Sequence, residues 1–65
     1  MYWILQANED RFIWDLDSET MYMLFENSAE KKPYSLMVLT KFRPYIRLVR
    51  KTRKKPSALF NIVSG

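Results

Sequence analysis

The sequence predicts a small α+β domain with two β-hairpins and a central helix. Three observations favour this class. The chain has 65 residues, enough for one domain and too few for two. Its hydrophobic content of 48% and aromatic content of 15% supply the apolar surface that offsets the entropy lost on folding. It contains one glycine, whereas small β-barrels commonly use several in turns that need positive φ. An all-β small barrel is therefore the alternative.

The N-terminal segment predicts the first hairpin. Residues 2–7 have the aromatic and branched composition of a strand, and residues 8–10 are polar, as in a turn. In residues 11–16 the side chains alternate, which places Phe12 and Trp14 on one face. These two segments are expected to pair as antiparallel strands.

Residues 18–31 predict the central helix. The segment is rich in strong helix formers, Ser18 can cap its start, and Pro33 follows its end. The alternative is a strand with Met21 and Phe25 facing inward, because periodicity alone does not separate the two in so short a segment.

The second half of the chain predicts another hairpin and a basic loop. Residues 34–41 have the composition of a buried strand. Residues 44–52 are compatible with a strand or a helix, and their β-branched and aromatic content favours the strand. Residues 50–57 are expected to form a basic loop or arm. Residues 56–65 then form a short helix that starts at a proline, or alternatively an edge strand.

The charges are segregated along the chain. Seven acidic residues and one arginine give residues 1–30 a formal charge of −6. Ten Lys or Arg and no acidic residue give residues 31–65 a charge of +10. Such a distribution concerns partners and association more than fold.

A basic stretch over residues 41–55 has the composition of a nucleic-acid-binding element. It contains eight Lys or Arg, interleaved with aromatic and branched residues. Closely spaced cations displace counterions from phosphates, arginine binds phosphate bidentately, and an exposed ring can stack on an unpaired base. We therefore expect a small nucleic-acid-binding or regulatory protein that grips phosphates, in DNA or RNA. The expected contact residues are Arg43, Tyr45 (the stacking aromatic), Arg47, Arg50, Lys51, Arg53, Lys54 and Lys55.

Three other interpretations remain open. Trp, Tyr, Met and Arg are enriched in protein interfaces, so the chain is alternatively an inhibitor or adaptor of a larger protein. A domain of this size can also complete its burial by forming a homodimer. A further interpretation is that the acidic half of the chain pairs with the basic half inside one molecule. This interpretation differs from nucleic-acid binding in one geometric respect: whether the basic residues Arg47, Arg50 and Lys51 lie within reach of the acidic residues Asp15, Asp17 or Glu19, or face open water.

The composition argues against an enzyme and against a resident metal or other cofactor. The chain has no cysteine and no histidine, and therefore lacks the thiol nucleophile and the commonest general base and metal ligand. Asp15, Asp17, Glu19 and Glu26 match a calcium-loop spacing, but Thr20 stands where that loop needs glycine. We therefore expect a non-enzymatic chain.

The longest apolar runs are too short to cross a membrane, and the apolar start of the chain is too short for a signal peptide. The sequence thus predicts a cytoplasmic protein that starts at Met1.

Overall fold

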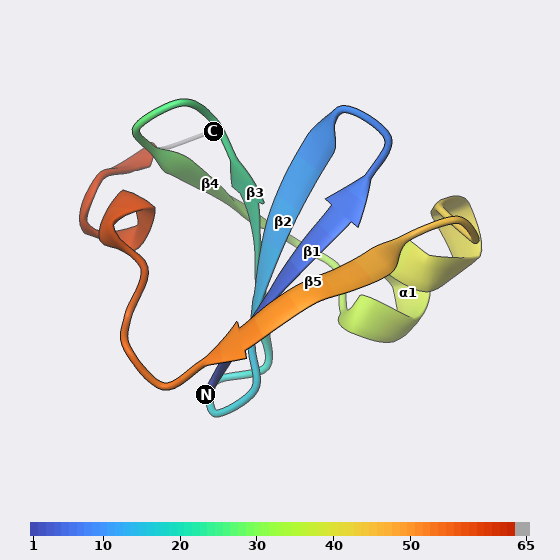
Figure 1. Ribbon diagram of the computed structural model, residues 1–65, viewed down its shortest axis with the longest axis horizontal. Helices are drawn as coiled ribbons and strands as arrows, with labels where there is room; N and C mark the ends of the chain where they lie inside the picture. The colour runs from blue at the N-terminus through green and yellow to red at the C-terminus, as the bar shows by residue number, and fades with distance from the viewer. Residues whose placement is uncertain (64–65) are drawn as a thin grey trace.

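Residues 1–63, which the computed structural model describes, form a six-stranded sheet with one α-helix and one 3-10 helix (Figure 1). The radius of gyration of 10.7 Å agrees with the value of about 11 Å expected for a compact chain of this length. In chain order the elements are β1 (Tyr2–Ala7), β2 (Asp10–Asp15), β3 (Thr20–Leu24), β4 (Ala29–Lys32), α1 (Leu36–Phe42), β5 (Arg47–Thr52), η1 (Ser57–Phe60) and β6 (Ile62–Val63).

The strands lie in the order β5-β1-β2-β3-β4-β6, and the sheet is not closed into a barrel. Neighbours are antiparallel except for β4 and β6, which are parallel. The first hairpin is confirmed, with Trp3 opposite Trp14 and Leu5 opposite Phe12. The domain is therefore α+β, as predicted, but dominated by its sheet.

Residues other than glycine take the left-handed conformation in the turns of the described chain. Asn8, between β1 and β2, has φ 54°, and Glu19, between β2 and β3, has φ 50°. Asparagine tolerates this conformation better than glutamate does. The second turn gains support from Asp15, whose Oδ1 accepts hydrogen bonds from the backbone N–H groups of Asp17 at 3.0 Å and Ser18 at 3.4 Å. The shortage of glycine thus did not limit the amount of sheet.

The predicted central helix over residues 18–31 is wrong, because this segment forms a turn followed by β3 and β4. Met21 and Met23 lie opposite Trp14 and Phe12 across the β2–β3 ladder. Met21 is completely buried. Burial of this alternating face is worth more than the small differences in helix propensity on which the prediction depended.

The predicted strand over residues 34–41 is also wrong, because α1 occupies most of it. Ser35 caps the helix: its hydroxyl accepts a hydrogen bond from the Val38 N–H at 3.3 Å, and its carbonyl accepts one from the Leu39 N–H at 3.0 Å. Leu36 and Leu39 then pack on the sheet. The apolar run of this segment is therefore part of a short helix that turns Leu36 and Leu39 toward the sheet and leaves Met37 and Val38 exposed.

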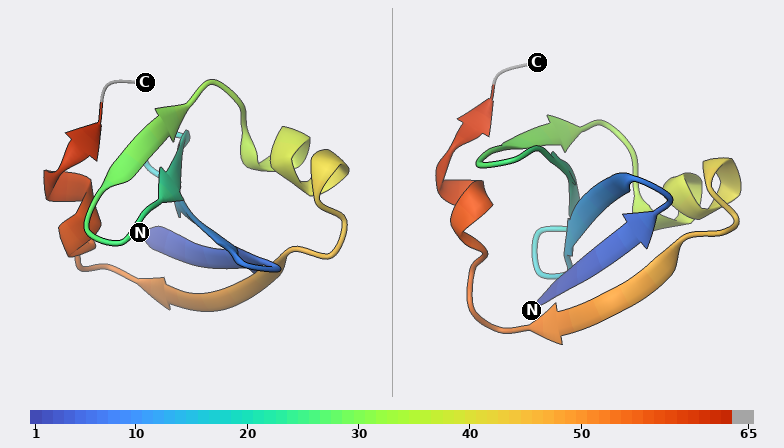
Figure 2. Two further views of the ribbon diagram at one scale, coloured as in Figure 1. Left: turned by 90° about the horizontal axis from the view of Figure 1, so that it is seen from above. Right: turned by 45° about the horizontal axis from the view of Figure 1, so that its top comes forward.

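Both faces of the sheet are apolar, and each has its own cover. Figure 2 shows α1 and η1 on opposite sides of the curled sheet. The face under α1 contains the cluster Leu5, Ala7, Phe12, Trp14, Met21 and Leu39. The face under η1 contains the cluster Ile4, Ile13, Ala29 and Leu59.

The C-terminal predictions are partly confirmed. The strand expected within residues 44–52 is β5, although it pairs with β1 and not with the preceding segment. The basic loop is shorter than expected, since residues 50–52 belong to β5 and residues 53–56 connect it to η1. The short helix after Pro56 is present as η1, but it ends at Phe60 and β6 follows. The remainder of that prediction, residues 64–65, lies outside the described residues.

Candidate nucleic-acid interface

The ion pairs of the described chain leave most of its basic C-terminal residues without an acidic partner. The N-terminal ammonium pairs with Asp17 at 3.0 Å, Lys32 with Glu30 at 2.8 Å, and Arg43 with Asp10 at 2.7 Å. The cations on β5 and in the loop after it form no such pair among residues 1–63. We call this set the basic edge: Arg47, Arg50, Lys51, Arg53, Lys54 and Lys55.

The basic edge is exposed because β5 is an outer strand of the sheet. It pairs with β1 on one side only, and its residues are exposed except for Thr52. The register shifts at Val49, so that Leu48 lies opposite Leu5 and Arg50 opposite Ile4. Arg50 thus lies on the face that η1 covers. Charged residues on an outer strand also oppose pairing with the edge of another sheet.

Lys51 lies on the other face of β5, opposite Trp3. Its Nζ is 5.0 Å from the centroid of the Trp3 ring. An ammonium group at this distance is attracted to the face of the ring, and Lys51 remains exposed to solvent. The basic edge therefore presents cations from both faces of β5.

The loop that follows β5 is stabilised by hydrogen bonds between the Thr52 side chain and the Lys54 backbone. Thr52 Oγ1 accepts a hydrogen bond from the Lys54 N–H at 3.1 Å and donates one to the Lys54 carbonyl at 3.5 Å. Pro56 then has φ −60° and leads into η1. Lys55 Nζ lies 4.9 Å from the centroid of the Phe60 ring. The loop is therefore held at both ends, by β5 and by η1.

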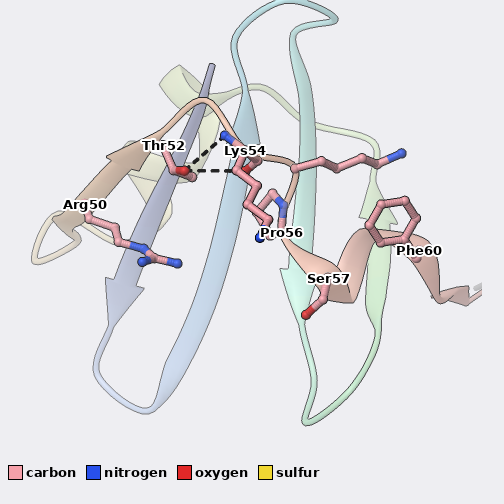
Figure 3. A pocket seen from close by; sticks show the side chains of 7 residues that line it. Arg50, Thr52, Lys54, Pro56, Ser57 and Phe60 are labelled. Carbon is pink, nitrogen blue, oxygen red and sulfur yellow. Dashed lines mark hydrogen bonds between the residues drawn. The ribbon is translucent and has the colours of Figure 1, made fainter.

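A cleft of about 390 Å³ lies between β5 and η1. Figure 3 shows Arg50 on one side and Phe60 on the other, with Ser57 between them. Its charged residues are all basic, so the electrostatic potential inside it favours anions over cations. The lining residues are Arg50, Thr52, Lys54, Lys55, Pro56, Ser57 and Phe60.

Arg43 and Tyr45, both predicted to contact nucleic acid, lie apart from this cleft. Arg43 Nη2 donates to Asp10 Oδ2 at 2.7 Å, and its Nη1 donates to the Tyr45 hydroxyl at 3.4 Å and the Ala7 carbonyl at 3.5 Å. The guanidinium carbon is 5.9 Å from the centroid of the Phe12 ring. The hydrogen bond that Arg43 donates to the Asp10 carboxylate raises the pKa of Arg43 above its ordinary value. Arg43 thus ties the end of α1 to the β1–β2 hairpin.

Phe60 was not among the predicted site residues. It is 70% exposed, although it is a large apolar side chain. The sequence shows an aromatic residue close behind a basic run, but only the fold turns that aromatic toward the cations. Leu59, its neighbour, is buried against the sheet instead.

No protein-family model, curated protein or solved structure matches this chain.

The acidic residues with calcium-loop spacing do not assemble into a metal site. No group of three or more acidic side chains in the described range is placed to hold a metal ion. Asp15 supports the β2–β3 turn and Asp17 pairs with the chain terminus. Neither helix in residues 1–63 is both long and apolar enough to span a membrane.

Proposed function

We propose that this chain binds nucleic acid through the phosphate backbone, with the basic edge as the contact surface. The observation that carries the proposal is that six cations share one continuous segment and have no acidic partner among residues 1–63. Cations that are not neutralised internally retain their attraction for a polyanion.

The shape of the basic edge suits an extended ligand. A strand of six residues, such as β5, is about 20 Å long. Arg47, Arg50 and Lys51 are spread along it, and the loop continues the row with three further cations. Several neighbouring phosphates can therefore be contacted together. Because phosphates are common to all sequences, the binding is expected to depend little on base sequence.

The proposal predicts a strong dependence of affinity on salt. If about four cations engage phosphates, log affinity should fall with log salt at a slope of about −3 for single strands and about −4 for duplex DNA. Fluorescence anisotropy with labelled single-stranded and duplex DNA and RNA, between about 50 and 200 mM salt, measures this slope.

A matched pair of variants distinguishes the effect of the basic edge on affinity from the effect of net charge. Arg50→Gln with Lys54→Gln removes two cations from the edge, and Arg11→Gln with Lys31→Gln removes one arginine and one lysine elsewhere on the surface. The first variant should weaken binding and reduce the single-strand slope by about 1.4, while the second should change it much less. Absent binding at low salt, or equal effects of the two variants, would refute the proposal.

A second candidate is a protein-interaction module, and exposed apolar side chains on α1 favour it. Met37 is 69% exposed and Phe42 is 71% exposed. Methionine and aromatic residues are common anchors of protein interfaces. Substituting both by serine should then abolish binding to the protein partner without lowering nucleic-acid affinity. A homodimer through this surface would appear as a concentration-dependent mass in sedimentation or light scattering, and the same variant should abolish it.

A further inference from the structure

We infer that the cleft between β5 and η1 holds one unpaired nucleotide, so that the chain prefers single strands to duplexes. The inference rests on the proposed nucleic-acid binding and specifies the form of the ligand. It follows from the position of Phe60 beside Arg50, Lys54 and Lys55 in a single cleft. The cleft thus offers cations for a phosphate and an aromatic ring for a base.

The cations of the cleft supply the phosphate contact. Arg50 extends from β5 and Lys54 from the loop, and neither forms an ion pair among residues 1–63. Ser57 adds a hydroxyl between them and the aromatic ring (Figure 3). Guanidinium and ammonium groups both donate hydrogen bonds to phosphate oxygens, and the guanidinium does so bidentately.

Phe60 supplies a surface for the base. With 70% of it exposed, the ring is available to a ligand. Aromatic side chains stack on bases of any identity, because every base has a π face. The ammonium group of Lys55 lies over one face of the ring, 4.9 Å from its centroid, so a base stacked on the other face would have positive charge nearby. The base and its phosphate would therefore be bound by adjacent groups.

The backbone on both sides of Phe60 is held in place before any ligand binds. Leu59, the preceding residue, is 5% exposed and packs against the sheet. Asn61, the following residue, accepts a hydrogen bond at its carbonyl from the Ala29 N–H at 3.2 Å, and its side chain donates to the Asn27 carbonyl at 3.1 Å. A stacking residue on such a fixed turn loses little conformational entropy on binding.

The size of the cleft and the nature of stacking both favour an unpaired nucleotide. A volume of about 390 Å³ is within the range of small-ligand sites, and a duplex is too wide to enter it. Within a duplex each base is covered by its neighbours, so Phe60 can reach an open base face only on a single strand. A duplex would contact the basic edge from outside, through phosphates alone.

The test compares two exposed phenylalanines. Phe60→Ala removes the ring from the cleft, and Phe42→Ala removes an equally exposed ring from α1. The probes are a labelled oligothymidylate and a labelled duplex at one salt concentration, with thymidine monophosphate as a competitor. Phe60→Ala should lose about tenfold to a hundredfold in affinity for the single strand and little for the duplex, whereas Phe42→Ala should lose little for either. Phe60→Trp should restore single-strand affinity.

The outcomes separate the inference from the proposed function. Equal affinity of Phe60→Ala and the unaltered chain for the single strand would overturn the inference, and so would an equal loss for strand and duplex. The proposed function stands without the inference if affinity still decreases with rising salt and is lower in the variant Arg50→Gln/Lys54→Gln. If the chain binds neither the single strand nor the duplex, the inference and the proposed function are both refuted. Competition by free thymidine monophosphate for the single-stranded probe that is lost in Phe60→Ala would support one nucleotide in the cleft, and competition that persists in Phe60→Ala would overturn the inference.

Discussion

Leu59→Ala should destabilise the domain far more than Phe60→Ala, although the two residues are neighbours on η1. Leu59 is 5% exposed and belongs to the cluster of Ile4, Ile13 and Ala29, whereas Phe60 is 70% exposed. Truncation of a buried leucine to alanine costs about 2–5 kcal/mol. Because η1 is short and can settle into part of the space, we expect about 2–3 kcal/mol. Phe60→Ala should change the free energy of unfolding by less than about 0.5 kcal/mol.

Urea unfolding followed by tryptophan fluorescence measures both values. A domain of this size has a free energy of unfolding of about 3–10 kcal/mol, so the loss for Leu59→Ala is a large fraction of the total. In thermal unfolding it corresponds to a decrease in Tm of about 10–20 °C. Equal costs for the two variants, or a cost below about 0.5 kcal/mol for Leu59→Ala, would refute the claim that Leu59 anchors η1 to the sheet.

Three further predictions concern the core, the pH dependence and the ion pair of α1. Met21→Ala should lower the free energy of unfolding by about 2–5 kcal/mol in urea unfolding, because this completely buried side chain leaves a cavity; a smaller cost would mean that the site collapses. Burial, and then the charge of Asp15, raises the pKa of Tyr22 above its ordinary value of 10.0. A raised pKa means that the folded state favours the protonated form of Tyr22 more than the unfolded state does. The contribution of Tyr22 to the stability of the fold is therefore complete below pH 10 and is lost as the pH rises through the folded-state pKa. Tyr22→Phe should therefore show a smaller decrease in Tm on going to alkaline pH, and an unchanged decrease would contradict this account. Arg43→Met and Asp10→Asn should each lower Tm, and the double variant should lose less than the sum of the two in a double-mutant cycle. Additive losses would show that this pair does not couple.

The first hairpin was predictable from the sequence because its signals are local. Residues 2–7 and 11–16 have strand composition, and a polar turn separates them. The two largest errors, over residues 18–31 and 34–41, have one physical cause. Their secondary structure depends on which sheet residues they contact, such as Trp14 opposite Met21, and propensity does not contain that information.

The candidate site was predictable in part. The basic run is contiguous in sequence, so its position is visible without a structure. The ion pair that holds Arg43 apart from the cleft was not visible in the sequence, because its partner Asp10 lies 33 residues earlier in the chain. The exposure of Phe60 was equally hidden, because it depends on the buried neighbour Leu59.

By itself, the sequence determined the size of the domain, its first hairpin and the accumulation of positive charge in its second half. These properties depend on composition and on neighbours along the chain. Only the tertiary structure decided that six of those cations have no acidic partner among residues 1–63, and that Phe60 shares a cleft with three of them, Arg50, Lys54 and Lys55. Ion pairing and burial are set by contacts between residues distant in sequence, and these contacts exist only once the sheet has formed.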